Sequence, residues 1–223
     1  QLRSLDLQAR MKLHEYNFNG NPMQILNLGS VPRLKSVKVQ TSHSTDYDFA
    51  ISGLEIESFE VSNIGSDYFK NIIFDTPNIK SVYVSSYSDT DIDFSSIPSV
   101  ETIKLDAKNV YNIDITKNPN LKSFEFDGGS NPNIKEIDFS YNSELTSVKL
   151  THCGITGLDL SNNLKVTDVK LLAKNCKYIN LGYNPVLKEL NPLLDGSAIS
   201  LPRNEHDDLI VIAPLLESLT LTE

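Results

Sequence analysis

Two short apolar patterns alternate along this chain, and each returns after about 21 residues. The first series of apolar pairs is Tyr16/Phe18, Val37/Val39, Phe59/Val61, Val82/Val84, Ile103/Leu105, Phe124/Phe126, Val148/Leu150 and Val169/Leu171. The second series is Leu5/Leu7, Leu26/Leu28, Leu54/Ile56, Ile72/Phe74, Ile92/Phe94, Ile113/Ile115, Ile137/Phe139, Leu158/Leu160, Ile179/Leu181 and Ile199/Leu201. A fixed period in this range is the signature of stacked repeats, in which each coil contacts only its neighbours. The chain is therefore predicted to be a solenoid.

One residue separates the two apolar residues of each pair. On a strand, this spacing turns both apolar side chains to one side and the middle residue to the other. We predict a mostly β solenoid with a strand on both sides of each coil and little helix. It forms a single domain over residues 1–223 with about ten coils, about 50 Å long at about 4.8 Å per coil. No polar repeat follows the last strand pattern, Leu216 to Leu221, so we expect a larger parent chain.

The clearest repeat runs from Leu145 to Ile155 and has the spacing L-x-x-L-x-L-x-x-C/N-x-I, with Val148, Leu150 and Cys153 between its ends. The same frame returns at 13–23 and at 166–176. This pattern resembles the leucine-rich repeat family, in particular its short bacterial, internalin-like repeats. The resemblance implies a right-handed superhelix that serves as a non-catalytic protein-recognition module of an exported bacterial protein, extracellular or at the cell surface, and binds a partner protein on one face.

The middle residues of the first series define the candidate binding row. If this series forms the concave sheet, the row faces a protein partner, and its members are Asn17, Lys38, Glu60, Tyr83, Lys104, Glu125, Lys149 and Lys170. Lysine and glutamate also alternate in it, and such cross-strand pairs stabilise a stack by about 0.2 to 1 kcal/mol each. Partner binding and stacking both remain open as explanations of the row.

The middle residue of the second series is aspartate in four successive coils, at Asp93, Asp114, Asp138 and Asp159. A column of carboxylates repels itself unless a cation or hydrogen bonds compensate it. A flat column does not converge on a cation as calcium sites do. Hydroxyl residues stand two positions after each aspartate, so we favour hydrogen bonds from Ser95, Thr116, Ser140 and Ser161.

Asparagines mark the turns that follow the second series. Asn118, Asn142, Asn163, Asn184 and Asn204 stand where an inward-facing turn leaves backbone amides without partners. We predict that they form a structural ladder. Cys153 and Cys176 are offset by two residues on neighbouring coils, about 7 to 8 Å apart, which favours two buried thiols over a disulfide.

Two stretches break the repeat. Residues 41–49 are predicted to be an insertion, which either carries binding function or is a place where drift is tolerated. The segment Asp127-Gly128-Gly129-Ser130 is predicted to be a smaller insertion that forms a turn.

Catalytic motifs are missing from the sequence. The four histidines are scattered, and no nucleophile elbow, zinc-protease motif or phosphate loop occurs. The cluster Asn204 to Asp208 is explained by a charged turn without a metal. We therefore predict no enzyme activity and no cofactor. The formal net charge of −9 argues against nucleic acid, and no stretch is apolar enough to span a membrane.

A second function is suggested by two tyrosines in polar turns. Tyr141 and Tyr183 stand in Ser-Tyr-Asn and Gly-Tyr-Asn, where their rings are available to stack on sugars. A carbohydrate-binding module is thus the alternative to protein recognition, together with a purely structural spacer at the cell surface.

Overall fold

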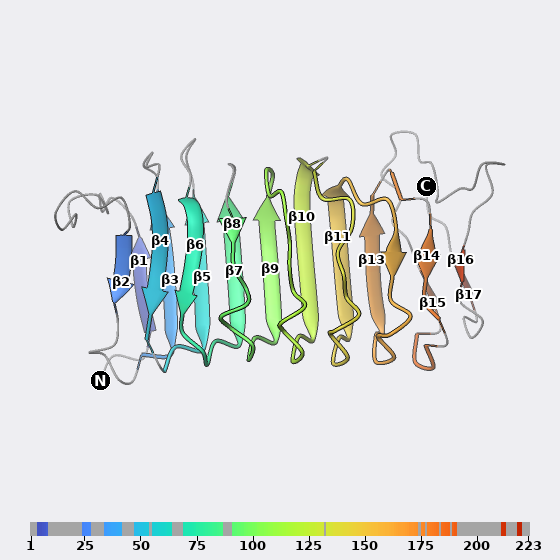
Figure 1. Ribbon diagram of the computed structural model, residues 1–223, viewed down its shortest axis with the longest axis horizontal. Helices are drawn as coiled ribbons and strands as arrows, with labels where there is room; N and C mark the ends of the chain where they lie inside the picture. Colours follow the sequence, from blue (N-terminus) through green and yellow to red (C-terminus); the bar gives the residue numbers. More distant parts are fainter. Residues whose placement is uncertain are drawn as a thin grey trace.

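The computed structural model describes residues 4–8, 24–27, 34–41, 47–53, 55–63, 69–86, 91–131, 133–173, 175–176, 178–182, 184–187, 189–190, 211–212 and 218–219. These residues form a β solenoid that contains no helix in its described part, so the predicted fold class is confirmed (Figure 1). Every strand pairing in it is parallel. Parallel pairing follows from the coiling, because each turn brings the chain back in the same direction.

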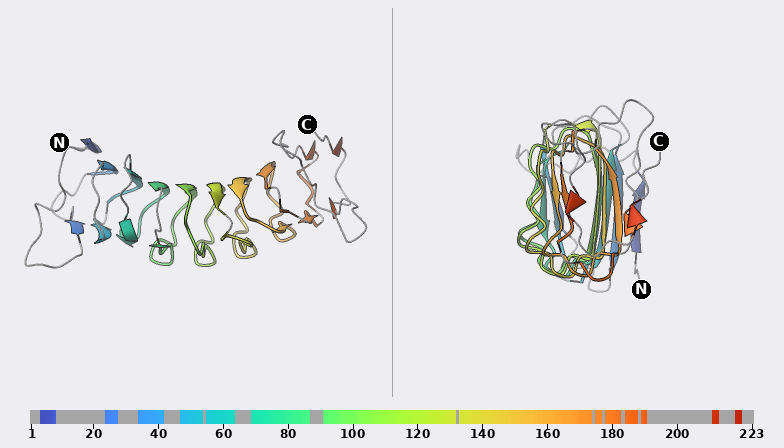
Figure 2. Two further views of the ribbon diagram at one scale, coloured as in Figure 1. Left: turned by 90° about the horizontal axis from the view of Figure 1, so that it is seen from above. Right: turned by 90° about the vertical axis from the view of Figure 1, so that its right-hand side faces the viewer.

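One long sheet covers one side of the solenoid. Its eight strands, in spatial order, are β1 (Ser4–Gln8), β3 (Ser36–Thr41), β5 (Ser58–Asn63), β7 (Ser81–Ser86), β9 (Thr102–Ala107), β10 (Ser123–Asn131), β11 (Ser147–Cys153) and β13 (Asp168–Leu172). Figure 2, left, shows the molecule as a shallow arc with this sheet on the inner, concave side. We call it the concave sheet.

The opposite, convex side carries shorter strands. A four-stranded sheet contains β2 (Gln24–Asn27), β4 (Tyr47–Ser52), β6 (Phe69–Asp75) and β8 (Asp91–Ile92), and a three-stranded sheet contains β12 (Leu158–Asp159), β14 (Ile179–Asn180) and β16 (Val211–Ile212). A separate pair joins β15 (Glu189–Leu190) to β17 (Ser218–Leu219). Between β8 and β12 the convex segments 113–115 and 134–139 form no strand.

The core fills the space between the two sides. Apolar residues of both series are buried, among them Val37, Phe59, Phe124 and Leu160. Rings from opposite sides meet there: Phe59 of β5 and Phe74 of β6 pack edge to face at 5.8 Å, as do Phe124 and Phe139 at 5.5 Å. Such pairs add about 0.5–1.5 kcal/mol beyond the area that they bury.

The predicted asparagine ladder is present in four consecutive coils. The side chains of Asn118, Asn142, Asn163 and Asn184 are buried, and each Nδ2 donates to two backbone carbonyls of the preceding coil. Asn204 lies outside the described residues. Thus the turn that contains each asparagine is tied to the turn before it.

Two strand assignments from the sequence are wrong. Leu5 and Leu7 belong to the concave sheet, where β1 pairs with β3, and not to the convex series. On the convex side Ile51 lies between Leu26 and Phe74, in the place predicted for Leu54 and Ile56. Spacing alone did not separate the two series here, because both have the same two-residue alternation. Tyr16, Phe18, Ile199 and Leu201 lie outside the described residues.

The predicted insertions also need correction. Thr41 ends β3, and Tyr47–Phe49 begin β4, so both ends of the 41–49 stretch belong to strands, while residues 42–46 lie outside the described residues. Asp127 to Ser130 form no separate turn but continue β10, with a register shift between Asp127 and Asn131. Gly129, with a φ of 51°, takes a left-handed conformation at this bulge.

Candidate protein-binding face

The candidate row crosses the concave sheet as one line. Lys38, Glu60, Tyr83, Lys104, Glu125, Lys149 and Lys170 occupy register positions on seven consecutive strands, from β3 to β13. Buried residues flank each of them, so the side chains of the row point away from the core. On β1, the strand next to β3, Asp6 stands in register with Lys38. Asn17 lies outside the described residues.

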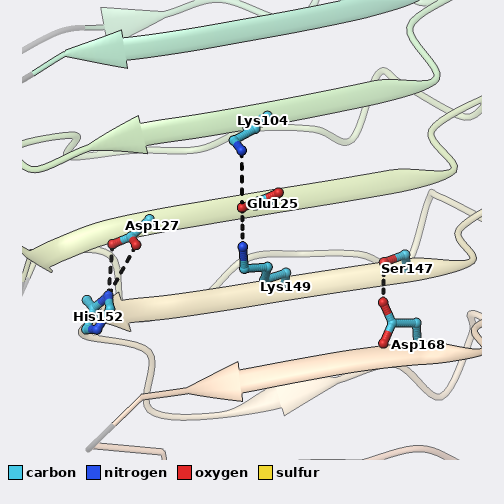
Figure 3. Close-up of polar contacts among 7 residues, drawn as sticks. All are labelled: Lys104, Glu125, Asp127, Ser147, Lys149, His152 and Asp168. Carbon is cyan, nitrogen blue, oxygen red and sulfur yellow. Dashed lines mark hydrogen bonds and ion pairs between the residues drawn. The ribbon is translucent and has the colours of Figure 1, made fainter. Parts of the chain in front are cut away.

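Ion pairs connect neighbouring members of this row. The Lys38 Nζ lies 2.7 Å from Glu60, and Glu125 accepts from Lys149 on one side and faces Lys104 at 3.6 Å on the other (Figure 3). The Lys104 ammonium also lies 5.4 Å from the centre of the Tyr83 ring, within range of a cation–π contact. The row therefore has the cross-strand pairing that the alternation of charge predicts.

Glu125 is the electrostatic centre of the row. Its partial burial alone would raise the pKa of the carboxyl, but the hydrogen bond from Lys149 and the charge of Lys104 hold that pKa below its ordinary value. Lys170 differs, because it lies opposite Lys149 on the next strand. It has no ion-pair partner among the described residues. The row thus ends in two neighbouring lysines that share no carboxylate.

A second row lies on the same face, and its continuity from strand to strand was not predicted from the sequence. Small hydroxyl residues lie in register two positions before the charged row and are Ser4, Ser36, Ser58, Ser81, Thr102, Ser123 and Ser147. Asp168 follows them on β13, and its carboxylate accepts from the Ser147 hydroxyl at 3.0 Å (Figure 3). The sequence contains the pattern that could have predicted this row, because a serine or threonine precedes the first apolar residue of almost every concave strand.

The rim of the concave sheet carries further ion pairs. One residue before the hydroxyl row, lysine and glutamate alternate from coil to coil. Lys35 lies 2.7 Å from Glu57, and Glu101 binds Lys80 at 3.2 Å and Lys122 at 2.6 Å. These contacts are exposed to solvent, where individual pairs stabilise by about 0–1 kcal/mol. The concave sheet therefore has small hydroxyls between two lines of paired charges.

Asp127, in the middle of β10, meets His152, near the end of β11. The Nδ1 atom of His152 lies 3.1 Å from Asp127 Oδ1, and Gly129 N donates to the same oxygen at 3.0 Å (Figure 3). Burial opposes ionisation of Asp127, but the Gly129 and His152 contacts lower the pKa of this carboxyl. His152 has a φ of 51°, unusual for a residue other than glycine. The pair fixes the bulge of β10 beside β11.

The aspartate column lies exposed on the convex side and is held by hydrogen bonds. In each coil the carboxylate accepts from the backbone N–H two residues later, at 2.8 to 3.0 Å. The hydroxyls of Thr116 and Ser161 donate as well, at 2.7 and 2.6 Å. The described residues include no group of three or more histidine, cysteine or acidic side chains placed to hold a metal ion. Donation by the hydroxyl is thus confirmed for Thr116 and Ser161, whereas Ser95 and Ser140 bind the aspartate of their coil through the backbone N–H.

Both cysteines are buried free thiols. Burial raises the pKa of Cys153 and of Cys176 to about 11, so both are protonated at neutral pH. The Cys176 thiol donates to the Tyr178 carbonyl at 3.2 Å. Tyr141 is exposed, whereas Tyr183 and residues 204–208 lie outside the described residues. Within the described part of the chain, no helix is long and apolar enough to cross a membrane.

Comparison with known proteins gives a similarity in structure but none in sequence family. No protein-family model and no curated protein matches the chain. Among solved structures, the chain is similar to the functional domain of InlJ from Listeria monocytogenes, which includes a cysteine ladder. The two are 13% identical with a TM-score of 0.41, over 89% of this chain and 52% of that chain. This chain therefore spans about half the length of the chain that it matches.

Proposed function

We propose that this protein is a non-catalytic leucine-rich repeat module that recognises a partner protein through its concave sheet. The observation that carries the proposal is the continuous row from Lys38 to Lys170, charged at every position but Tyr83, which lies on one face beside a row of small hydroxyls. Small side chains let a partner approach closely, and paired charges select complementary groups and increase the rate of association. By its resemblance to internalin-like repeats, we assign the module to the extracellular side of a bacterium.

The competing explanation is that the row only holds the coils together. In that case the lysines and glutamates are needed as pairs, and their order is irrelevant. A charge swap separates the two explanations. In the variant Lys104→Glu, Glu125→Lys, Lys149→Glu, the central charge still lies between two opposite charges, so the stacking pairs remain, while the pattern offered to a partner is inverted.

The test is capture of proteins from bacterial envelope and host-cell extracts by the immobilised chain. We expect a specific protein on the wild type, its loss on the charge-swap variant, and equal thermal stability of the two. Lys165→Glu, in a turn outside the concave sheet where the lysine pairs with Glu144 at 2.6 Å, is the matched control and retains the partner. If the charge-swap variant captures the same protein as the wild type, the row is structural and the proposal is wrong.

A further inference from the structure

An open depression lies on the convex side, away from the charged row. It has a volume of about 330 Å³ and separates the coil 134–140 from the coil 155–161. Its lining includes Asp138, Ser140, Gly157, Asp159, Asn162 and Tyr178. This volume is at the lower end of the range of small-molecule sites, about 300 to 1,000 Å³.

The depression lies at a place where the backbone hydrogen bonds between neighbouring convex coils are few. On one side of β12, Leu158 N and Leu160 N donate to the carbonyls of Tyr178 and Asn180, at 3.0 and 2.7 Å. On the other side, Thr156 N to Lys135 O is the one backbone hydrogen bond to the coil 134–140 in the described part of the chain. Since successive residues of a strand direct their N–H and C=O groups to opposite sides, Asp159 offers its backbone groups to the depression. Such groups require a partner from water or a ligand.

Gly157 and Tyr178 shape one wall. A Cβ atom on Gly157 would lie 2.0 Å from Cε1 of Tyr178, so the ring leans over the glycine and occupies the space that a side chain would need. The tyrosine remains 38% exposed. Burial, followed by the charges of Glu136 and Asp159, raises the pKa of its hydroxyl, which therefore stays a proton donor at neutral pH.

The remaining described lining supplies hydrogen-bond acceptors and donors. Asp138 uses one carboxylate oxygen to hold its own turn, through Ser140 N at 2.9 Å. Ser140 and Asn162 add a hydroxyl and an amide, and Ile137 and Phe139 give an apolar floor. Among the residues that the structure describes, the lining contains no lysine or arginine, which disfavours an anionic ligand.

We propose that this depression binds a single neutral saccharide unit. The hydroxyls of a sugar donate to carboxylates and accept from amide groups, while the C–H bonds of its ring contact an aromatic side chain. Carboxylate, amide, backbone and tyrosine are all present here, and the volume admits one ring. The site is independent of the concave sheet, so the module would have two binding surfaces.

In the experiment, the ¹⁵N-labelled chain is titrated with glucose, galactose, mannose and N-acetylglucosamine, and its amide NMR shifts are measured. Butylamine serves as a cationic probe. We expect at least one sugar to shift the amides of Asp138, Gly157 and Asp159. Tyr178→Ala should weaken that binding about tenfold or more, which corresponds to about 1.4 kcal/mol. Tyr111→Ala, an exposed tyrosine outside the depression, is the matched control and should bind normally.

Three outcomes would overturn the proposal: no sugar shifts these amides, butylamine alone does, or Tyr178→Ala binds the sugar unchanged. Asn162→Ala, on an exposed turn, is a second variant with an expected loss of about threefold or more, in case the tyrosine variant fails to fold. The charge-swap variant of the concave sheet should titrate like the wild type. Failure at one surface is therefore distinguishable from failure at the other.

Discussion

Asn142 donates its side-chain amide to the backbone carbonyl of Asn118 at 2.8 Å, and Asn163 donates in the same way to Asn142 at 2.9 Å. Each asparagine thus ties its own coil to the one before. Because these side chains are fully buried, no water replaces a bond that is lost. The ladder links coils that have no strand pairing on the convex side at 113–115 and 134–139.

Replacing Asn142 with alanine should reduce the free energy of unfolding by about 2–4 kcal/mol, because it leaves the carbonyls of Ile115 and Asn118 buried without this donor. Urea denaturation followed by circular dichroism measures the loss. The matched control is Asn120→Ala, whose exposed amide donates to Pro98 O at 3.2 Å and should contribute less than about 1 kcal/mol. Equal losses of unfolding free energy in the two variants would show that a buried ladder bond contributes no more than an exposed one.

Glu125→Gln should lower the free energy of unfolding at pH 7 by about 1 kcal/mol, since it removes the charge shared by Lys104 and Lys149. The folded-state pKa of Glu125 lies below its unfolded value, so the contribution is complete above the unfolded pKa, about 4.3, and is lost as the pH falls through the folded pKa. The denaturation curves of wild type and variant should therefore differ at pH 7 and coincide at about pH 2.5. A difference that persists in acid would assign the effect to packing.

Cys153 and Cys176 should react slowly with Ellman's reagent at pH 8 in the folded chain, because the pKa of each thiol is about 11 and both are buried. In guanidinium chloride both should react fully and fast. Free thiol counted by absorbance at 412 nm gives the result directly. Immediate reaction of either cysteine in the native state would contradict its placement in the core.

Two glycines with left-handed backbone should respond differently to alanine. A Cβ on Gly182 would meet the Ser161 Cα at 2.9 Å, whereas a Cβ on Gly129 would meet the flexible Lys108 side chain at 2.7 Å. We expect Gly182→Ala to cost about 1–3 kcal/mol and Gly129→Ala about 1 kcal/mol, because backbone moves less easily than a lysine side chain. Thermal melts of the two variants provide the comparison. The opposite order would show that the backbone at Ser161 moves to accommodate a Cβ atom on residue 182.

The sequence predicted those features that depend on period and alternation. The solenoid, the register of Lys38 to Lys170 and the buried asparagines all follow from one repeat frame. Prediction from the sequence failed where two segments share the same local pattern. Leu5 and Leu7 alternate like residues of the concave or of the convex side, and Ile51 is followed by another apolar pair. Neither the hydroxyl row nor the Tyr178 depression was predicted. The depression depends on how far neighbouring coils separate on the convex side, and alternation carries no information on that distance.

Photo-crosslinking from single positions tests the central claim most directly. Benzoylphenylalanine is placed at Thr102, in the hydroxyl row of the concave sheet, or at Thr116, on the convex side. The chain is then irradiated in envelope and host-cell extracts. Recognition through the concave sheet predicts one discrete adduct from position 102, absent from position 116 and lost in the charge-swap background. An adduct from position 116 with none from 102 would contradict the account.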